Sequence, residues 1–493
     1  SDCFVLGECW HPDGAYSMKG RAMGLFLQDT ITIANRWTVS AGIRFDKAYN
    51  WNPAQKRLDS PWCGQTTGLS MPEMFCGGSF QEQPVAFEFN DLTPRIGVVW
   101  DVTGDGTWAL KANFSRYPEA LGISYGGVTN VNDVGSEDWN WYDPNGDGIF
   151  QFGEQTTMRS SWYPGAGTEV DDELQAPLTD EFTFGLEHEV FDNILLSATG
   201  IYRGRRDDVG TINIGVPYGL MFDSDKCKAE CTPVNPWGTD PWVKLQTVDP
   251  GDDGVIGTAD DGGPIPIWAV NPNTYGTNNY LTTNPNVWGF HDDTWYKGVS
   301  LVASKRWSNN WQMLASWDIG TSEYQGSAYN PNSLWNSRRQ LSSNHRDHIL
   351  KLTANYLIAE PIGVNLGIFI RAQSGQAFYA NYTYDSELLE ELGPYENQSN
   401  WGMTVVGRGE MGDKQCNGCN RPENEPFTTL VDVRAEKQFT IGKYGVVHAY
   451  FDVFNVMNAN TITSFYTTIN SRWMEPTYVL PPRVMRIGGA WDF

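Results

Sequence analysis

Segments in which apolar and polar side chains alternate recur along the whole chain. Period-two alternation is typical of a β-strand whose two faces meet different surroundings, and a tilted strand of about ten residues can cross a bilayer. Ten clear segments cover residues 37–46, 95–101, 108–115, 182–189, 194–203, 311–318, 350–356, 364–371, 431–439 and 447–453. Noisier segments near 25–33 and 295–307, with a final one at 479–493, bring the expected number of strands to thirteen.

The polar face of these segments carries charged side chains on strand after strand. In the first clear segment, Trp37 and Ile43 alternate with Arg44 and Asp46. In the final segment, one face carries Met485, Ile487, Trp491 and Phe493. An apolar face outside and a polar, wet face inside predict a transmembrane antiparallel β-barrel. A soluble β-sandwich also alternates, and the pattern alone leaves it open as the alternative.

Long and short connections alternate strictly between the segments. The short ones are residues 34–36, 104–106, 192, 308–309, 360–363 and 442–444. The long ones are residues 48–90, 119–179, 207–292, 322–344, 375–427 and 458–478. Outer-membrane barrels have short periplasmic turns and long extracellular loops. Counting back from a periplasmic Phe493 therefore predicts that every long loop, and residues 1–17, lie outside the cell.

Composition narrows the function classes. The formal net charge of −25 argues against a nucleic-acid partner, because such binding needs Lys and Arg on phosphates. Aromatic residues make up 13% of the 493 residues, as in a membrane-interface belt or a carbohydrate-binding β protein. The sequence contains no apolar run of about 18 residues, the length that would predict a membrane-spanning helix. The patterns HExxH, GxSxG and a phosphate-binding Gly-rich loop do not occur, so we expect no enzyme.

Eight motifs, in order along nearly the whole chain, carry a family resemblance. They are GLFLQDTITIANRWTVSAGIRFD at 24–46, LTPRIGVVWD at 92–101, ALKANFSRYPEA at 109–120, LTDEFTFGLEHEVFDN at 178–193, RDHILKLTANY at 346–356, SGQAF at 374–378, FDVFNVMNANT at 451–461 and LPPRVMRIGGAWDF at 480–493. Together they resemble the TonB-dependent outer-membrane transporters, and within these the Oar-like branch.

The resemblance implies a barrel of about 22 strands with a plug in its lumen, and transport powered by TonB. Residues 1–493 would then be the C-terminal part of the barrel, with the plug and first strands deleted, cleaved or carried on another chain. The expected number of thirteen strands agrees with this. Bacterial barrels have an even number of strands, and an open sheet would leave unpaired edges in lipid. Expected partners are outer-membrane lipid, the TonB system through the plug, and an N-terminal barrel or plug chain or other outer-membrane subunits.

We therefore expect a receptor or transporter barrel in the outer membrane of a Gram-negative-type bacterium. It would bind or move a bulky substrate through its extracellular loops, by import or by passage related to export. A structural or adhesive barrel without transport is one alternative. A secreted carbohydrate-binding β protein is the other.

The eight cysteines form four close pairs in polar segments rich in Gly and Pro. The pairs are Cys3 with Cys9, Cys63 with Cys76, Cys227 with Cys231, and Cys416 with Cys419. Such pairs predict local disulfides in an oxidising compartment. Zinc is the alternative at the last pair, but a structural zinc site needs four ligands and no second pair has matching spacing.

Residues 143–154 fit the twelve-residue pattern of a calcium loop. In that pattern, side chains at positions 1, 3, 5 and 12 and a carbonyl at position 7 supply oxygens, with Gly at position 6. The candidate ligands are Asp143, Asn145, Asp147, Ile149 and Glu154. We expect calcium with a structural role in this loop.

Residues 249–260 match the same twelve-residue calcium-loop pattern less completely. The candidate ligands are Asp249, Asp253, Val255 and Asp260, and Gly251 stands in place of the third ligand. The alternative in both loops is an Asx turn, in which Asp, Asn and Gly shape the backbone without metal. Residues 101–106 read DVTGDG in a short connection, and there the turn without metal is favoured.

Overall fold

The computed structural model describes most of the chain. The described residues are 17–59, 63–64, 76–130, 132, 136–151, 153–162, 168–217, 225–230, 242–248, 255–259, 261, 264–271, 279–290, 294–324, 340–341, 345–376, 380–384, 401–406, 425–468, 472 and 474–493. Within these ranges, no helix has the length and apolar character needed to cross a membrane.

Thirteen strands form one antiparallel sheet in the order of the chain. They are β1 (Lys19–Ile33), β2 (Trp37–Asn52), β5 (Gln83–Asp101), β6 (Trp108–Pro118), β10 (Leu178–Phe191), β11 (Ile194–Arg206), β16 (Thr294–Ser308), β17 (Trp311–Tyr324), β19 (His348–Ile358), β20 (Val364–Gln373), β23 (Thr428–Thr440), β24 (Val446–Phe454) and β27 (Val484–Asp492). The short strand β18 (Gln340–Leu341) adds to the end of β17. Each of the thirteen overlaps a predicted segment, so the predicted strand number and all-β fold are confirmed.

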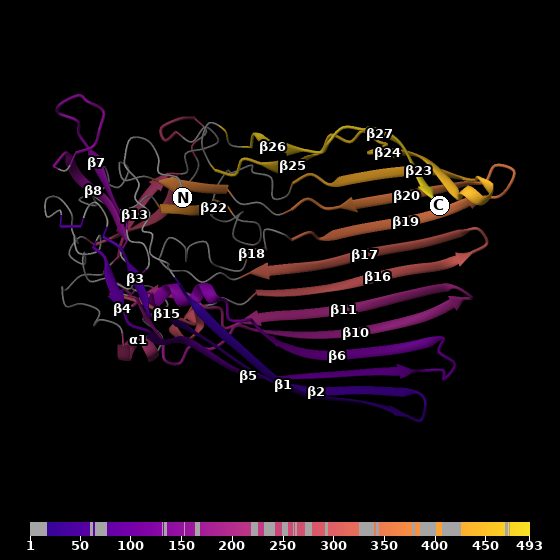
Figure 1. Cartoon of the computed structure of the whole chain (residues 1–493), viewed down its shortest axis with the longest axis horizontal. Helices are drawn as coiled ribbons and strands as arrows, with labels where there is room; N and C mark the ends of the chain where they lie inside the picture. Colours follow the sequence, from indigo (N-terminus) through magenta and orange to yellow (C-terminus); the bar gives the residue numbers. More distant parts are fainter. Residues whose placement is uncertain are drawn as a thin grey trace.

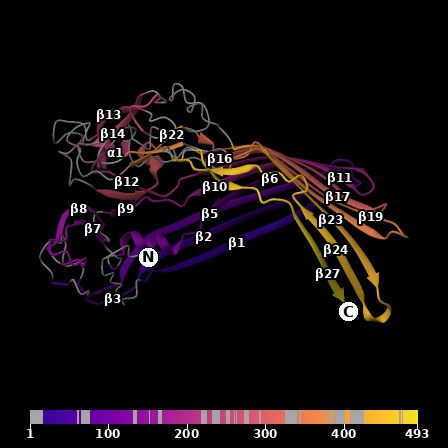
Figure 2. The ribbon, with the colours of Figure 1, turned by 90° about the horizontal axis from the view of Figure 1, so that it is seen from above.

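The sheet is open along both of its long sides. Among the described residues, β1 pairs only with β2, and β27 pairs only with β24. The sheet is strongly curved (Figure 2), and its end strands β1 and β27 lie at opposite sides of the sheet (Figure 1). Because thirteen strands alternate in direction, β1 and β27 run the same way. These strands alone therefore form a curved wall and not a closed antiparallel barrel.

The short connections lie at one end of the sheet and the long ones at the other (Figure 1). The turn between β1 and β2 has positive φ at Ala34 and Asn35, 51° and 54°. The turn between β16 and β17 repeats this at Asn309 and Asn310, 53° and 67°. Two successive left-handed residues make the turn whose twist suits a tight hairpin, and Asn tolerates that conformation. The local conformation of these residues thus accounts for the tight turns at the end of the sheet that carries the short connections.

The long connections contain small sheets that the alternation did not predict. Five hairpins are β3 (Gln55–Arg57) with β4 (Gly78–Phe80), β7 (Ser136–Trp141) with β8 (Gln155–Trp162), β13 (Trp242–Val248) with β14 (Pro264–Val270), β21 (Ala380–Tyr384) with β22 (Trp401–Val406), and β25 (Ile462–Phe465) with β26 (Pro476–Val479). A further sheet joins β12 (Gly210–Asn213), β15 (Tyr280–Thr283) and β9 (Thr168–Val170). The helical elements are η2 (Ile123–Thr129), α1 (Asp225–Glu230), η5 (Pro285–Trp288) and η6 (Gly442–Tyr444).

The final strand begins later than predicted. We expected one strand from Val479, but Val479 ends β26 and β27 starts at Val484. Pro481 and Pro482 lie between them. Proline has no N–H to donate to a strand ladder, so the pairing with β24 cannot run through this pair.

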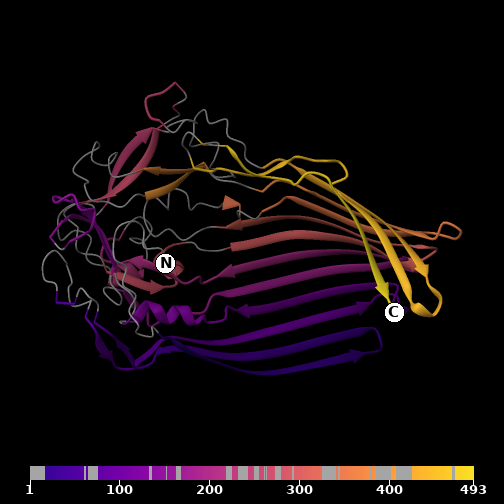
Figure 3. The same ribbon diagram turned by 45° about the horizontal axis from the view of Figure 1, so that its top comes forward.

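A buried hydrophobic cluster of the described chain lies among the long connections. It consists of Ile212, Ile214, Val216, Cys227, Trp242, Leu281, Trp288 and Phe290. These residues come from the connection between β11 and β16, which folds at the loop end of the molecule (Figure 3). We call the described residues of this connection, within 207–290, the extracellular body.

Candidate functional site

One face of the wall is apolar from strand to strand and is not covered by any described part of the chain. A single row of paired residues runs across eight strands: Asp29, Ala41, Ile96, Phe114, Phe182, Tyr202, Lys297 and Thr321. In that row Asp29, Lys297 and Thr321 are polar, whereas the next row towards the short turns is apolar throughout: Ile31, Val39, Val98, Ala112, Phe184, Gly200, Val299 and Ile319. Leu25 and Ile487 at the two ends of the sheet are 77% and 85% exposed. An exposed apolar surface of this extent marks contact with a membrane or a partner. We call this face the apolar face.

Aromatic side chains gather where the apolar face meets the short turns. Trp37 and Trp100 stack at 4.8 Å between ring centroids, and Trp108 stacks on His188 at 3.7 Å. At the other side of the sheet, Trp491 donates its indole N–H to the carbonyl of Tyr444 at 2.8 Å. Rings with an apolar body and a polar edge suit the boundary between hydrocarbon and water. This girdle places the short turns at a membrane surface.

The opposite face is polar, and its charges are paired across strands. Lys111 on β6 lies 2.7 Å from Glu187 on β10. On the last strands, Asp452 is buried and accepts hydrogen bonds from Arg486 at 2.7 and 2.9 Å. His448 lies between two carboxylates, 2.9 Å from Glu436 and 3.0 Å from Asp492. These ionisable residues of the described wall are paired with one another, which agrees with a lumen surface.

Tyr450 explains one of the two adjacent glycines in the final strand. Its ring lies across Gly488, where an added Cβ would be 2.4 Å from a ring carbon. Arg434 lies over the same ring, 4.0 Å from its centroid. An aromatic ring laid over a glycine on the neighbouring strand covers backbone that would otherwise be exposed. The missing side chain at Gly488 therefore leaves room for the Tyr450 ring, over which Arg434 lies.

The extracellular body is tied to the preceding connection by a buried ion pair, which sequence reasoning missed. Lys226 on α1 lies 2.6 Å from Asp171 and 3.1 Å from Glu173. Thr283 also donates to Asp171, at 2.5 Å, and Trp288 donates to Thr283 at 3.0 Å. Burial raises the pKa of Asp171, but the hydrogen bonds from Lys226 and Thr283 outweigh it and hold the pKa below its usual value. No local sequence pattern joins residues so far apart, so only the packing shows this pair.

The first candidate calcium loop has an ordered turn built on its own carboxylates. Asp143 accepts hydrogen bonds from the amides of Gly146 and Gly148 at 2.7 and 2.8 Å, which lower its pKa. Asn145 accepts from the amide of Asp147 at 2.9 Å, and Asp147 from that of Ile149 at 2.8 Å. The three carboxylates of this loop do not form one of the close metal-ligating groups of the described chain.

The last candidate ligand of this loop has other hydrogen bonds. Glu154 accepts from the indole of Trp141 and from the amide of Gln151, each at 2.8 Å. The turn at 101–106 repeats the first part of the pattern, since Asp101 accepts from the amides of Gly104 and Gly106. The same geometry thus occurs where no metal is expected, and calcium at residues 143–154 stays a prediction.

The second candidate calcium loop falls almost wholly outside the described residues. Asp249, Asp253 and Asp260 are not described. Val255 is described and is 56% exposed beyond the end of β13. Calcium at this loop also stays a prediction.

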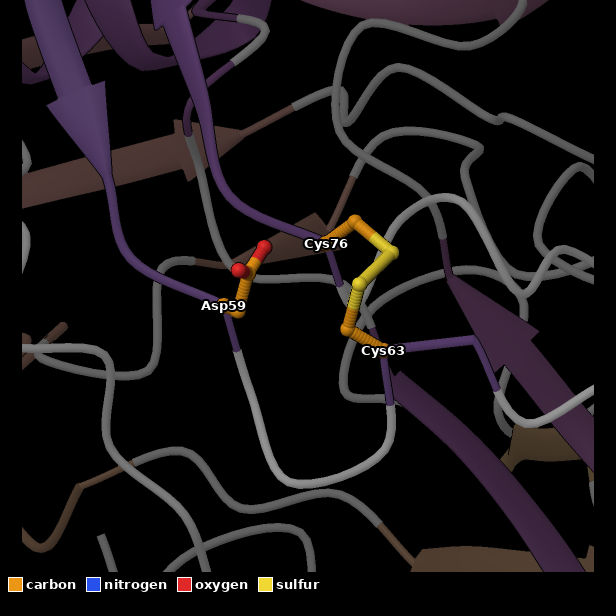
Figure 4. A group of neighbouring side chains, drawn as sticks. All are labelled: Asp59, Cys63 and Cys76. Carbon is orange, nitrogen blue, oxygen red and sulfur yellow. A yellow bond between two sulfur atoms is a disulfide. The ribbon is translucent and has the colours of Figure 1, made fainter.

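Cys63 and Cys76 lie in disulfide geometry, with their sulfur atoms 2.07 Å apart (Figure 4). Asp59 lies beside them, and the three residues form a close group of metal-ligand types. The joined sulfurs are not thiolates, however, and Asp59 accepts the amide of Gly77 at 2.7 Å. The group is therefore a braced loop and not a metal centre.

The remaining predicted pairs are only partly described. Cys227 is buried in α1 and disulfide-bonded. Its predicted partner Cys231, and the pairs Cys3 with Cys9 and Cys416 with Cys419, lie outside the described residues.

Known proteins similar to this chain are outer-membrane receptors and transporters. One curated relative, "TonB-dependent transporter Oar" from Myxococcus xanthus, is 25% identical over 228 residues, which cover 40% of this chain and 19% of that protein. The siderophore receptor PiuA from Acinetobacter baumannii has a TM-score of 0.46 at 10% identity, covering 96% of this chain and 43% of its own. The ferripyoverdine receptor of Pseudomonas aeruginosa has a TM-score of 0.45 at 12% identity, covering 97% and 39%.

The chain thus spans about a fifth of the curated relative's length and less than half of each solved structure. The curated relative and the two named structures are receptors or transporters. Residues 11–367 match the family described as "Outer membrane beta barrel domain". This match covers well over half of the chain, confirms the predicted outer-membrane location and disfavours a secreted carbohydrate-binding protein. The chain therefore belongs to the outer-membrane β-barrel domain family.

Proposed function

We propose that this chain is part of the barrel wall of a TonB-dependent transporter that takes a bulky substrate at its extracellular loops. The observation that carries the proposal is the two-faced, thirteen-strand wall with all its long connections at one end. A wet face lined by ion pairs suits a lumen, whereas an adhesive surface would need only the loops. The sequence similarity to the Oar transporter supports the same class.

The extracellular body supplies a rigid surface for recognition. Its own core and the Lys226–Asp171 pair order a connection that would otherwise be a long acidic loop. Binding residues are often carried on loops held by a rigid scaffold. We propose that this body contributes to the outer rim of the substrate site.

The open sides of the wall fit a larger barrel. Bacterial barrels close without free edges, and we propose that further strands and a plug complete this one. TonB would then act through the plug and not on the thirteen strands.

A binding measurement with TonB tests the proposal. The complete protein, extracted in detergent from outer membranes, is titrated with the labelled periplasmic domain of TonB, and fluorescence anisotropy is measured. A general porin of similar size is the control. Saturable binding to the protein and none to the porin is expected. Equal signals from both would contradict the proposal and favour a structural or adhesive barrel without transport.

A further inference from the structure

Asp29 is a carboxylate on the apolar face in the middle of β1. At alternate positions of the strand, this face carries Lys19 and Arg21 near its start and then Met23, Leu25, Leu27, Ile31 and Ile33. Its partners in the same row on the next three strands are Ala41, Ile96 and Phe114. Leu27 and Ile31 on either side of it are 74% and 54% exposed. Asp29 therefore lies among apolar residues of β1, β2, β5 and β6, although its row continues to Lys297 on β16.

A charge in these apolar surroundings is unfavourable if it faces lipid alone. Ionisable groups within a membrane usually pair with another group or line a polar cavity, and they mark functional positions. On the lipid face of a barrel, a charge destabilises most near the bilayer midplane. The hydrogen bond given to Asp29 comes from the main-chain amide of its neighbour Thr30, at 2.8 Å. The described chain thus places no cationic side chain on this carboxylate.

The free side of β1 can accept another strand. All fifteen residues of β1 are exposed, and β2 alone pairs with it in the described chain. Neither β27 nor the β27 of a second copy fits as an antiparallel partner, because β27 runs in the same direction as β1. The fitting occupant is a strand of opposite direction, with an apolar outer face and a positive charge at the level of Asp29.

We propose that the free side of β1 docks such an antiparallel strand, and that a Lys or Arg of this strand pairs with Asp29. An ion pair within the apolar face would fix the register of docking, because a shift by one residue turns the side chain to the other face. A shift by two would leave both charges unpaired. The inference rests on the barrel part of the proposed function and not on transport.

The direction in which Asp29 variants change the thermal stability tests the pairing. The complete protein is heated in detergent and run on an SDS gel, where the folded barrel migrates faster than the unfolded chain. The midpoint temperature is the one at which half of the protein is unfolded. Asp29→Leu and Asp29→Asn are both expected to lower the midpoint, because each leaves a cation unpaired. If Asp29 faces lipid alone, Asp29→Leu will raise the midpoint and overturn the proposal. Ala41→Leu, in the same row on β2, controls for added apolar volume.

A second measurement identifies the occupant and stays informative if a variant fails to fold. A photo-reactive residue replaces Ile31, which lies on the same face as Asp29, in the complete protein in its membrane, and the cross-linked peptides are identified by mass spectrometry. A peptide with Lys or Arg in an alternating strand pattern is expected. Cross-links to β27 of a second copy, or to lipid alone, would overturn the proposal. Failure of the TonB measurement would leave both results standing, so the two hypotheses are tested separately.

Discussion

Asp147 is the residue on which the calcium prediction can be decided. It occupies the fifth position of the loop at 143–154 and contacts the amide of Ile149 and the side chain of Gln151. Extracellular calcium modules bind with Kd on the order of 10⁻⁴–10⁻³ M. We expect calorimetry to show calcium binding in this range and to show its loss in Asp147→Ala. Asp105→Ala, in the matching turn at the short end, is the control, and unchanged calcium heat in Asp147→Ala would contradict the first site.

The Lys226–Asp171 pair should make the extracellular body sensitive to acid. The pKa of Asp171 is below its usual value in the folded chain, so its carboxylate stabilises the fold above the unfolded pKa. That contribution is lost as the pH falls below about 4. We expect amide hydrogen exchange in β12 and β15, corrected for intrinsic rates, to speed up in this range. Exchange with no change between pH 6 and pH 3 would contradict this account.

Removal of the cation should loosen the same body at neutral pH. The side chains of Lys226 and Asp171 are 13% and 6% exposed, so Lys226→Met leaves a buried carboxylate without its partner. Breaking a buried pair in this way costs about 3 kcal/mol. We expect hydrogen exchange in β12 and β15 to rise in Lys226→Met and to stay unchanged in Lys244→Met, whose side chain lies over Trp268 in the same body.

At the scale of the strand, Gly488 tests how the last strands fit together. Gly488→Ala would place a methyl group 2.4 Å from the ring of Tyr450. Overpacking of this kind costs about 1–3 kcal/mol, and we expect a lower urea midpoint in detergent. Gly200→Ala is the matched control, because its nearest atom would be 3.8 Å away. Equal midpoints for the two variants would show that the ring does not hold β24 to β27.

The thirteen wall strands were predictable because their signal is local. Each has one face towards an apolar medium and one towards a wet lumen, so alternation such as Trp37 to Asp46 records the environment directly. The hairpins β7–β8 and β13–β14 were missed because contacts between distant loop residues, such as Asp171 and Lys226, order the long connections. The start of β27 was missed because alternation was read through Pro481 and Pro482. Strand boundaries and loop structure therefore do not follow from the alternation alone.

The candidate site residues also divide into those that local spacing predicts and those that only the folded structure reveals. Spacing alone suggested Cys63 with Cys76, and their sulfurs lie in disulfide geometry. Spacing also suggested calcium ligands, but the same Asp–Gly geometry occurs at Asp101, so composition cannot separate a metal loop from a turn. Asp29 was part of a noisy segment in the sequence, and only the register with Ala41 shows that it lies on the apolar face.

At the scale of the whole molecule, the wall sets the orientation of every connection. The aromatic girdle lies beside the short turns, and the extracellular body lies at the other end. The same arrangement explains how a chain with a formal net charge of −25 can enter a membrane. Its apolar face meets lipid, while ion pairs such as Lys111–Glu187 and Arg486–Asp452 lie on the lumen face.

Labelling of single added cysteines in living cells tests this orientation most directly. Tyr142→Cys lies in a long connection and Ile362→Cys in a short turn, and both native side chains are well exposed, at 67% and 54%. With a membrane-impermeant maleimide, we predict labelling of Tyr142→Cys in intact cells, and of Ile362→Cys only after the outer membrane is permeabilised. Equal labelling of both in intact cells would contradict a membrane-spanning wall.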